Sequence, residues 1–186
     1  LTAGGDVDKA TEIDPTQRAA RTDGRSPAAM LTSTFSDELA MHTVRRAKMF
    51  GVSIKDRGAV SMAGHAGKAF WFSKSTGQFV SSRFYYDRYP QWVTDFNESK
   101  PTQRYADNHW KLLLERGQYQ FADLDDMPWE TDLGGFRRVF PHPYGPSNGK
   151  LFNTLLTLSP AGDDLTLAFA KQLIDHEGLG DDEVTD

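Results

Sequence analysis

The chain has 186 residues, of which 38% are hydrophobic and 12% aromatic, enough to bury the core of one domain or one large lobe. It has no Cys, which excludes disulfides and Cys-zinc sites, and no apolar run near the roughly 20 residues of a membrane-spanning helix. The formal net charge of −5 argues against nucleic acid as a partner, because proteins that bind the phosphate backbone carry a basic face.

The N-terminal segment differs in composition from the rest of the chain. Residues 1–31 are polar and poor in large apolar side chains, so we expect a mobile or loosely packed lead-in. Residues 32–186 then form the folded part. Thr34 and Asp37 have the spacing of a helix capping box, and the apolar periodicity after them predicts a helix over residues 35–47.

An apolar run over residues 48–54 predicts a buried strand. A helix followed by such a strand is half of a β-α-β unit, which indicates an α/β fold with a parallel sheet. Side chains alternate along a strand, so Lys55 and Arg57 are expected to leave its end on the same side. Ligands of open α/β sheets bind beyond the carboxyl ends of the strands, where this pair suits a phosphate or carboxylate. The alternative is two solvated cations in a turn that flanks Asp56.

Residues 68–86 contain two aromatic and β-branched runs around a short loop at residues 75–77, the pattern of a β-hairpin. The aromatic side chains could stack on a sugar or a base. Such density more often forms hairpin core against a sheet or helix, which we favour. Pro90 then opens a short helix that ends near residue 97.

The signals weaken over the next fifty residues. Residues 110–114 fit either a strand or a buried helical turn. The cluster of Asp123, Asp125 and Asp126 lacks the Gly and the distal Glu of a calcium-binding EF-hand loop, so we expect a solvated acidic loop. Pro, Gly and Asn make residues 141–149 an irregular connector.

The last helix is the clearest by periodicity. Ser159 is a good N-cap, Pro160 suits the first helical position and Gly178 is a natural stop, which predicts a helix over residues 160–177. The face expected to be buried consists of Leu165, Ala168, Phe169, Gln172 and Leu173.

The five His residues are scattered, with no pair at metal-ligand spacing. His65 alone lies near Lys55 and Arg57 in the sequence, in a loop whose backbone can approach a ligand. Two roles remain open for it: contact with a substrate, or a hydrogen bond that stabilises the loop.

Several segments, taken together and in order, resemble the middle of the bacterial alkaline phosphatase superfamily. More narrowly, the chain is similar to monoesterases with a Thr nucleophile and a Lys-x-Arg pair, grouped with the type I phosphodiesterase/nucleotide pyrophosphatase proteins. The resemblance covers about residues 26–180. The segments that carry it are 53–59, 63–66, 69–72, 90–97, 140–143 and 159–163.

The resemblance implies that Lys55 and Arg57 contact the non-bridging oxygens of a phosphate monoester, while two zinc ions hold the nucleophile and leaving-group oxygens. In that family the nucleophile, an Asn of the phosphate site and the first Asp ligand precede the matched region, and the other Asp and His ligands follow it. This implies a fragment of a longer parent protein, with no catalytic nucleophile or metal ligand of its own. Residues 68–150 would include cap or insertion segments, and the parent would be periplasmic or secreted.

We therefore expect an α/β fragment with part of a parallel sheet, covering helices and an aromatic hairpin excursion. Its parent would be a zinc-dependent phosphohydrolase of phosphate monoesters, with diesters as an alternative substrate class. The isolated chain should be inactive and hold no zinc, and it should self-associate because helix 160–177 lacks the strand that follows it in the family. The competing hypothesis is a non-enzymatic module that binds a glycan or a protein through the aromatic hairpin.

Overall fold

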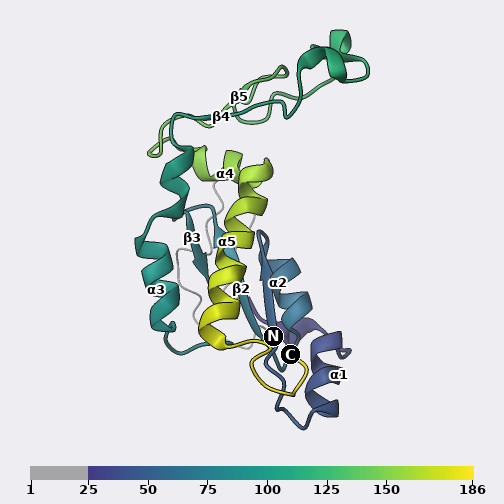
Figure 1. Cartoon of the computed structure of the whole chain (residues 1–186), viewed down its shortest axis with the longest axis vertical. Helices are drawn as coiled ribbons and strands as arrows, with labels where there is room; N and C mark the ends of the chain where they lie inside the picture. The colour runs from purple at the N-terminus through teal and green to yellow at the C-terminus, as the bar shows by residue number, and fades with distance from the viewer. Residues whose placement is uncertain (1–24) are drawn as a thin grey trace.

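The computed structural model describes residues 25–186, which form a body of helices around a sheet and an arm that projects from one end of the body (Figure 1). Most of the expected lead-in, residues 1–24, lies outside the described residues. Its remaining part includes the short 3-10 helix η2 (Pro27–Ala29), whose Pro27 is buried.

A three-stranded sheet in the order β1-β2-β3 lies at the centre of the body (Figure 1). β1 and β2 are parallel, with Phe50 opposite Lys68, and β2 and β3 are antiparallel, with Ser73 opposite Gln78. The expected hairpin is therefore present, and it continues the parallel sheet instead of standing apart from it. The strands are β1 (Phe50–Ser53), β2 (Lys68–Ser73) and β3 (Gln78–Val80).

The β-α-β unit consists of β1, α2 (Asp56–Ala63) and β2. Its helix was not predicted, and the predicted strand 48–54 is shorter than expected because the chain turns into α2 soon after Ser53. Gly51 makes the close packing of α2 on β1 possible, since a Cβ at this position would lie 2.1 Å from the carbonyl oxygen of Ala59.

The first helix, α1 (Phe35–His42), begins with the predicted capping box. The backbone N–H of Thr34 donates to Asp37 Oδ2 at 2.9 Å, and that of Asp37 donates to Thr34 Oγ1 at 3.3 Å. The prediction that this helix continues to residue 47 is wrong. Val44 and Arg45 adopt positive φ angles of 53° and 59°, which end the helix whatever the apolar periodicity.

Side chains alternate along β2 and divide the core into two layers. Ala69 and Trp71 pack with the apolar residues of α2. Phe70 and Phe72 belong to the larger cluster on the other side, where Phe169 stacks on Phe79 with 4.3 Å between ring centroids. The helices of that cluster are α3 (Gln91–Glu98), α4 (Phe152–Thr157) and α5 (Pro160–Glu177).

The aromatic side chains of β2 and β3 are core residues, as we favoured. The exposed fraction is 0% for Phe70, 3% for Trp71 and 1% for Phe79. Because these rings are buried between helices and sheet, they offer no surface on which a sugar can stack. The rings of β2 and β3 therefore give no support to a binding module that uses the aromatic hairpin, and the exposed ring of the segment is Phe84, after β3, at 39%.

The helices predicted at residues 90–97 and 160–177 are confirmed as α3 and α5, and Gly178 ends α5 in the left-handed conformation. Two details differ. The Ser159 hydroxyl donates to the carbonyl of Leu156 at 3.0 Å instead of capping α5, and Gln172 is exposed although it was placed on the buried face. α4 was not predicted.

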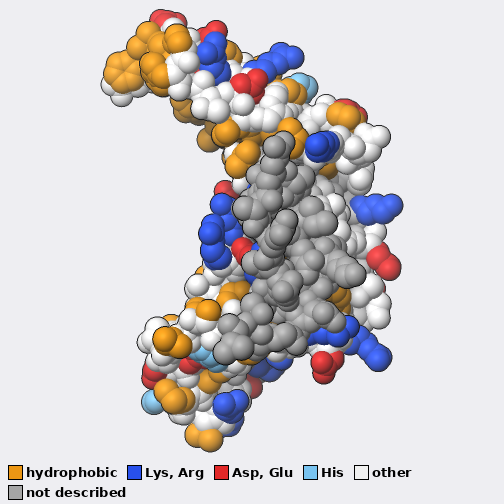
Figure 2. All heavy atoms as spheres, turned by 180° about the vertical axis from the view of Figure 1, so that it is seen from behind, with side chains coloured by type: hydrophobic (Ala, Val, Ile, Leu, Met, Phe, Trp, Pro, Cys, Tyr) orange, Lys and Arg blue, Asp and Glu red, His pale blue; other side chains and the backbone are white. Residues whose placement is uncertain are grey.

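The arm is built on a two-stranded ribbon of β4 (His109–Trp110) and β5 (His142–Pro143), which follows the 3-10 helix η3 (Pro101–Tyr105). The 3-10 helices η4 (Arg116–Gln118) and η5 (Ala122–Leu124) lie in the long connection between the strands. Residues 110–114 are not buried as a unit, since Leu113 is 91% exposed. Seen from behind, the molecule is hollowed between the arm and the far end of the body, and Lys and Arg side chains gather in the hollow (Figure 2).

Within residues 25–186, the structure has no helix that combines the length and the apolar character needed to cross a membrane.

Candidate functional site

Lys55 and Arg57 lie between the carboxyl end of β1 and the first turn of α2. Lys55 is the N-cap residue, with φ −109° and ψ 137°, and Arg57 is the second residue of the helix. Strand alternation does not set the directions of the two side chains, because the strand ends at Ser53 and Arg57 is helical. Both cations are exposed, and both lie at the end of a parallel strand where α/β proteins bind ligands.

The turn that carries the two cations is fixed by short polar contacts. Ser53 Oγ accepts a hydrogen bond from the backbone N–H of Lys55 at 3.3 Å. A Cβ on Gly58 would lie 2.7 Å from the same Oγ atom, so the first turn of α2 packs closely on the end of β1. The positions of the two side chains are therefore set by the β1-α2 junction and not by a loop.

Asp56, between the two cations, is engaged by other groups. Its Oδ1 accepts the backbone N–H of Arg57 at 2.8 Å, and its Oδ2 pairs with Arg25 from the segment before η2. Among the described residues, neither Lys55 nor Arg57 has an ion pair with an acid. The carboxylate nearest to Lys55 and Arg57 in the sequence thus neutralises Arg25 instead of either of these cations.

The electrostatics of this end of α2 favour an anion. The amino end of a helix carries partial positive charge and unpaired N–H groups, so cations there oppose the helix dipole at a cost of about 0.3–1 kcal/mol each. Lys55 and Arg57 add to that positive potential, and the first-turn acid Asp56 offsets only part of it. A bound phosphate or carboxylate would remove this conflict.

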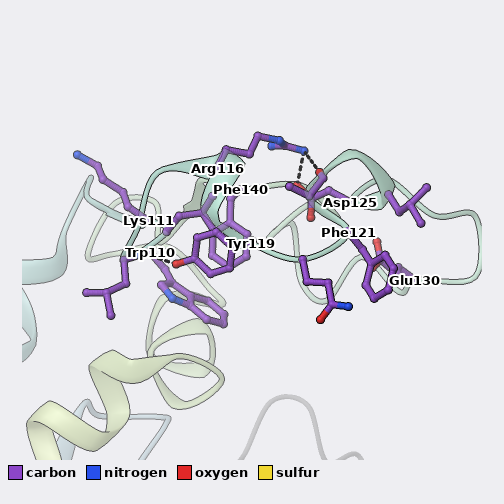
Figure 3. Close-up of a pocket in the computed structure, with 13 residues that line it drawn as sticks. Trp110, Lys111, Arg116, Tyr119, Phe121, Asp125, Glu130 and Phe140 are labelled. Atoms are coloured by element: carbon purple, nitrogen blue, oxygen red, sulfur yellow. Dashed lines mark hydrogen bonds and ion pairs between the residues drawn. The ribbon is translucent and has the colours of Figure 1, made fainter.

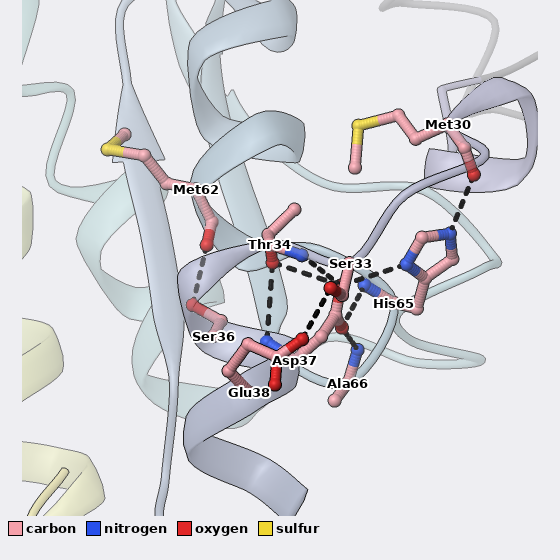
Figure 4. Close-up of polar contacts among 9 residues, drawn as sticks. All are labelled: Met30, Ser33, Thr34, Ser36, Asp37, Glu38, Met62, His65 and Ala66. Atoms are coloured by element: carbon pink, nitrogen blue, oxygen red, sulfur yellow. Dashed lines mark hydrogen bonds and ion pairs between the residues drawn. The ribbon is translucent and has the colours of Figure 1, made fainter.

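The structure does not bring His65 to Lys55 and Arg57. Residues 56–63 form α2 between them, so the cations lie at its amino end and His65 lies beyond its carboxyl end. At 1.5 Å per residue, a helix of this length separates its two ends by about 12 Å. His65 lies instead beside the amino end of α1 (Figure 4).

Both ring nitrogens of His65 face hydrogen-bond acceptors. Nδ1 lies 2.9 Å from Asp37 Oδ2, and Nε2 lies 3.2 Å from the carbonyl oxygen of Met30 (Figure 4). The hydrogen bond to Asp37 raises the pKa of the imidazole. The sequence left two roles open for His65, and these contacts favour the hydrogen bond that stabilises the loop.

Asp37 is the acceptor that organises this corner of the fold. Its Oδ1 accepts the backbone N–H groups of His65 at 2.7 Å and Ala66 at 2.9 Å, and its Oδ2 accepts from Thr34. Partial burial raises the pKa of this carboxyl, but the hydrogen bonds from His65, Thr34 and Ala66 outweigh it and hold the pKa well below its usual range. Gly64 makes space for the Asp37 carboxylate, because a Cβ at this position would lie 2.6 Å from Asp37 Oδ2. The capping-box spacing identified Asp37 in the sequence, but not this wider role.

Residues 25–186 do not supply a donor set for zinc. They contain no group of three or more His, Asp or Glu side chains that could hold a metal ion. The acidic loop on the arm is ion-paired: Arg116 contacts Asp125 at 3.0 Å and Arg138 contacts Asp126 at 2.9 Å.

No family model matches the chain. Curated proteins similar to it include alkaline phosphatase PhoV of Synechococcus elongatus, 37% identical over 163 residues, and alkaline phosphatase PafA of Elizabethkingia meningoseptica, 35% identical over 163 residues. A protein of Myroides odoratus named as a calcium-transporting ATPase is 35% identical over 166 residues. Each match covers 87% of this chain, and the chain spans about 30% of the length of these relatives.

Solved structures of alkaline phosphatase PafA also match the chain. The crystal structure of wild-type PafA matches with a TM-score of 0.75 and 33% identity, over 87% of this chain and 31% of that one. A PafA variant with four substitutions matches with the same TM-score and identity. The α/β arrangement of the body, with its small mixed sheet and covering helices, is the arrangement found in these structures.

Proposed function

We propose that this chain, which is homologous to a segment of the alkaline phosphatase superfamily, is the part of a phosphohydrolase that holds the phosphate of a monoester substrate. Lys55 and Arg57 are the residues assigned to this task. The observation that carries the proposal is their position: two exposed cations without acidic partners among the described residues, at the carboxyl end of β1 and the positive end of α2.

The chemistry of the pair suits a phosphate monoester. A monoester presents about two negative charges and three non-bridging oxygens. The Arg guanidinium offers a planar fork of donors, and the Lys ammonium offers a compact charge. Both groups stabilise negative charge on the phosphoryl group as the ester bond breaks. A diester carries less charge and hides one oxygen, so it is the alternative and poorer substrate.

A PafA variant among the solved structures supports this assignment. Its four substitutions replace a Thr, an Asn, a Lys and an Arg, and the Lys and Arg lie two positions apart, as Lys55 and Arg57 do. The spacing fits the Lys-x-Arg pair on which the resemblance rests.

The remaining chemistry is assigned to the parent, by which we mean a longer polypeptide that contains this chain. The relatives are about three times as long as the matched region, and the described residues offer no donor set for zinc. We infer that the nucleophile and the ligands of two zinc ions belong to other parts of the parent, which acts in the periplasm or outside the cell. When bound, such ions polarise the phosphate ester and stabilise the leaving oxygen.

The test compares the parent with the isolated chain. The parent, cloned by extending the reading frame in both directions, should hydrolyse an aryl phosphate, lose activity with a chelator and contain stoichiometric zinc. The isolated chain should do none of these. A parent that hydrolyses neither phosphate monoesters nor diesters would end the proposal, and so would chelator-sensitive turnover by residues 1–186 alone.

A further inference from the structure

The arm contains a cavity of about 430 Å³ that is unrelated to Lys55 and Arg57. Its wall residues come from β4, the connection through η4 and η5, and the segment before β5 (Figure 3). Four aromatic residues line it: Trp110, Tyr119, Phe121 and Phe140. The volume lies within the range of about 300–1,000 Å³ found for small-molecule sites, which are mostly apolar with a few polar groups.

The cavity walls are held by the arm's own hydrogen bonds, so the space is preformed. The Tyr119 hydroxyl accepts the backbone N–H groups of Leu113 at 3.0 Å and Leu114 at 2.9 Å. Arg116 donates to the carbonyl of Ala122 at 3.1 Å, and to Asp125 (Figure 3). These contacts hold the loop that forms the wall.

One ring of the cavity, that of Phe121, is placed at an energetic cost and stays mostly exposed. Phe121 has φ 62°, a left-handed conformation that disfavours a bulky residue, and it is 70% exposed. Trp110 packs edge-on against Phe140, with 5.0 Å between ring centroids, and is only partly buried. Rings held rigidly and left open to water gain apolar contact when another ring fills the space.

The charges around the cavity select against an ionic ligand. The lining has two cations, Lys111 and Arg116, and two acids, Asp125 and Glu130, so the formal charges cancel. Arg116 is committed to Asp125, and Glu130 accepts the backbone N–H of Met127 at 3.3 Å. Lys111 is then the one lining cation without an acidic partner among the described residues, and a single ammonium in a lining with no net charge favours a phosphate less than the Lys55 and Arg57 pair does.

We propose that this cavity binds the neutral, flat aromatic ring of a small molecule, held by stacking and edge contacts with Trp110 and Phe121. The site is independent of the phosphate site, and its existence does not rest on the proposed hydrolase function.

The test uses indole as a neutral aromatic probe, followed by the shift of the Trp110 indole N–H resonance in the ¹⁵N-labelled chain. We expect saturable binding on the order of 1 mM, a strength typical of a ligand of this size. Cyclohexanol, with a comparable volume but no aromatic ring, and inorganic phosphate should bind at least tenfold more weakly.

Matched variants locate the site. Phe121→Ala should weaken indole binding about fivefold or more, through the loss of one aromatic wall. Phe121→Tyr, which keeps a ring, should bind as the unmodified chain does. Trp129→Ala removes a ring that is 76% exposed on the same arm but outside the cavity, and should change nothing.

Three results would overturn the proposal. They are the absence of saturable indole binding, equal binding by the unmodified chain and Phe121→Ala, and equal binding of cyclohexanol. The same titration on the parent tests whether a side chain from elsewhere in the parent fills the cavity. Loss of indole binding in the parent would assign the cavity to internal packing and reject the ligand site.

Discussion

A single carboxylate, that of Asp37, joins three segments of the body. It closes the amino end of α1 through Thr34, accepts two backbone N–H groups of the α2-β2 connection, and pairs with the His65 ring. Its side chain is only 11% exposed, so water cannot readily replace these partners.

Replacing Asp37 with Ala should therefore lower the free energy of unfolding by about 2–4 kcal/mol, because several buried N–H donors lose a charged acceptor. Urea denaturation of the chain measures this loss. Asp175→Ala, at an exposed position on α5, is the control and should change stability by less than about 0.5 kcal/mol. Similar losses in both variants would contradict the role given to Asp37.

His65 makes part of this stability depend on pH. Only the protonated ring has N–H groups for both Asp37 and the Met30 carbonyl, and the hydrogen bond to Asp37 raises its pKa above 6.5. A raised folded pKa means that the stabilisation is complete below pH 6.5 and is lost as the pH rises through the folded value. Asp37 behaves oppositely: its lowered pKa preserves its contribution down to strongly acid pH.

We accordingly expect the stability difference between the unmodified chain and His65→Gln to be largest near pH 6 and to shrink toward pH 9. Thermal or urea unfolding of the two proteins across this range measures the difference. A difference that does not change with pH would show that the second proton on His65 contributes nothing.

At the scale of elements, the contact between β1 and α2 sets the position of the proposed phosphate site. Gly51→Ala would place a Cβ 2.1 Å from the carbonyl oxygen of Ala59 and 2.9 Å from the backbone nitrogen of Ala63. Since backbone must move, we expect a loss of about 3 kcal/mol in urea denaturation. Gly117→Ala on the arm, where a new Cβ meets nothing within 4 Å, is the matched control. Equal stability of the two variants would contradict the tight β1-α2 contact.

The elements that the sequence predicted are those with local signals. α5 has a Pro at its start, a Gly at its end and a regular apolar face, and the hairpin has two aromatic runs around a Gly-containing turn. α2 was missed because its N-cap, Lys55, is not a capping residue type and makes no side-chain cap hydrogen bond, so the sequence gives no start signal for a helix there. The end of α1 at His42 depends on backbone conformation that its apolar pattern does not reveal.

The candidate site and the arm also differ in how far local sequence signals reveal them. The abrupt end of an apolar run located Lys55 and Arg57 at a strand end, but their orientation required knowledge of the helix that follows. The arm depends on the pairing of His109 with Pro143, residues far apart in the sequence with no local pattern to join them. The cavity formed by this pairing could not be predicted for the same reason.

At the scale of the whole molecule, the sheet of the described residues ends at β1 and β3. The edge at β3 is occupied by Asn97, which accepts the backbone N–H of Phe79 at 2.9 Å and donates to its carbonyl at 2.8 Å. β1 is therefore the edge left to pair with another chain. We propose that the isolated chain self-associates, as the sequence led us to expect. Light scattering should give an average mass that rises with protein concentration. A constant monomer mass over a hundredfold concentration range would reject this expectation.

The central claim is that Lys55 and Arg57 hold the phosphate of a monoester, and the most direct measurement is the kcat/KM of parent variants on two matched substrates. Lys55→Ala and Arg57→Ala should each lower kcat/KM for an aryl phosphate by on the order of tenfold to a thousandfold, as loss of a single charge-stabilising donor does at other sites. The loss for a matched aryl phosphate diester should be much smaller. Lys171→Ala, an exposed cation on α5, should lose nothing on either substrate. Equal losses on both substrates, or no loss on the monoester, would contradict the account.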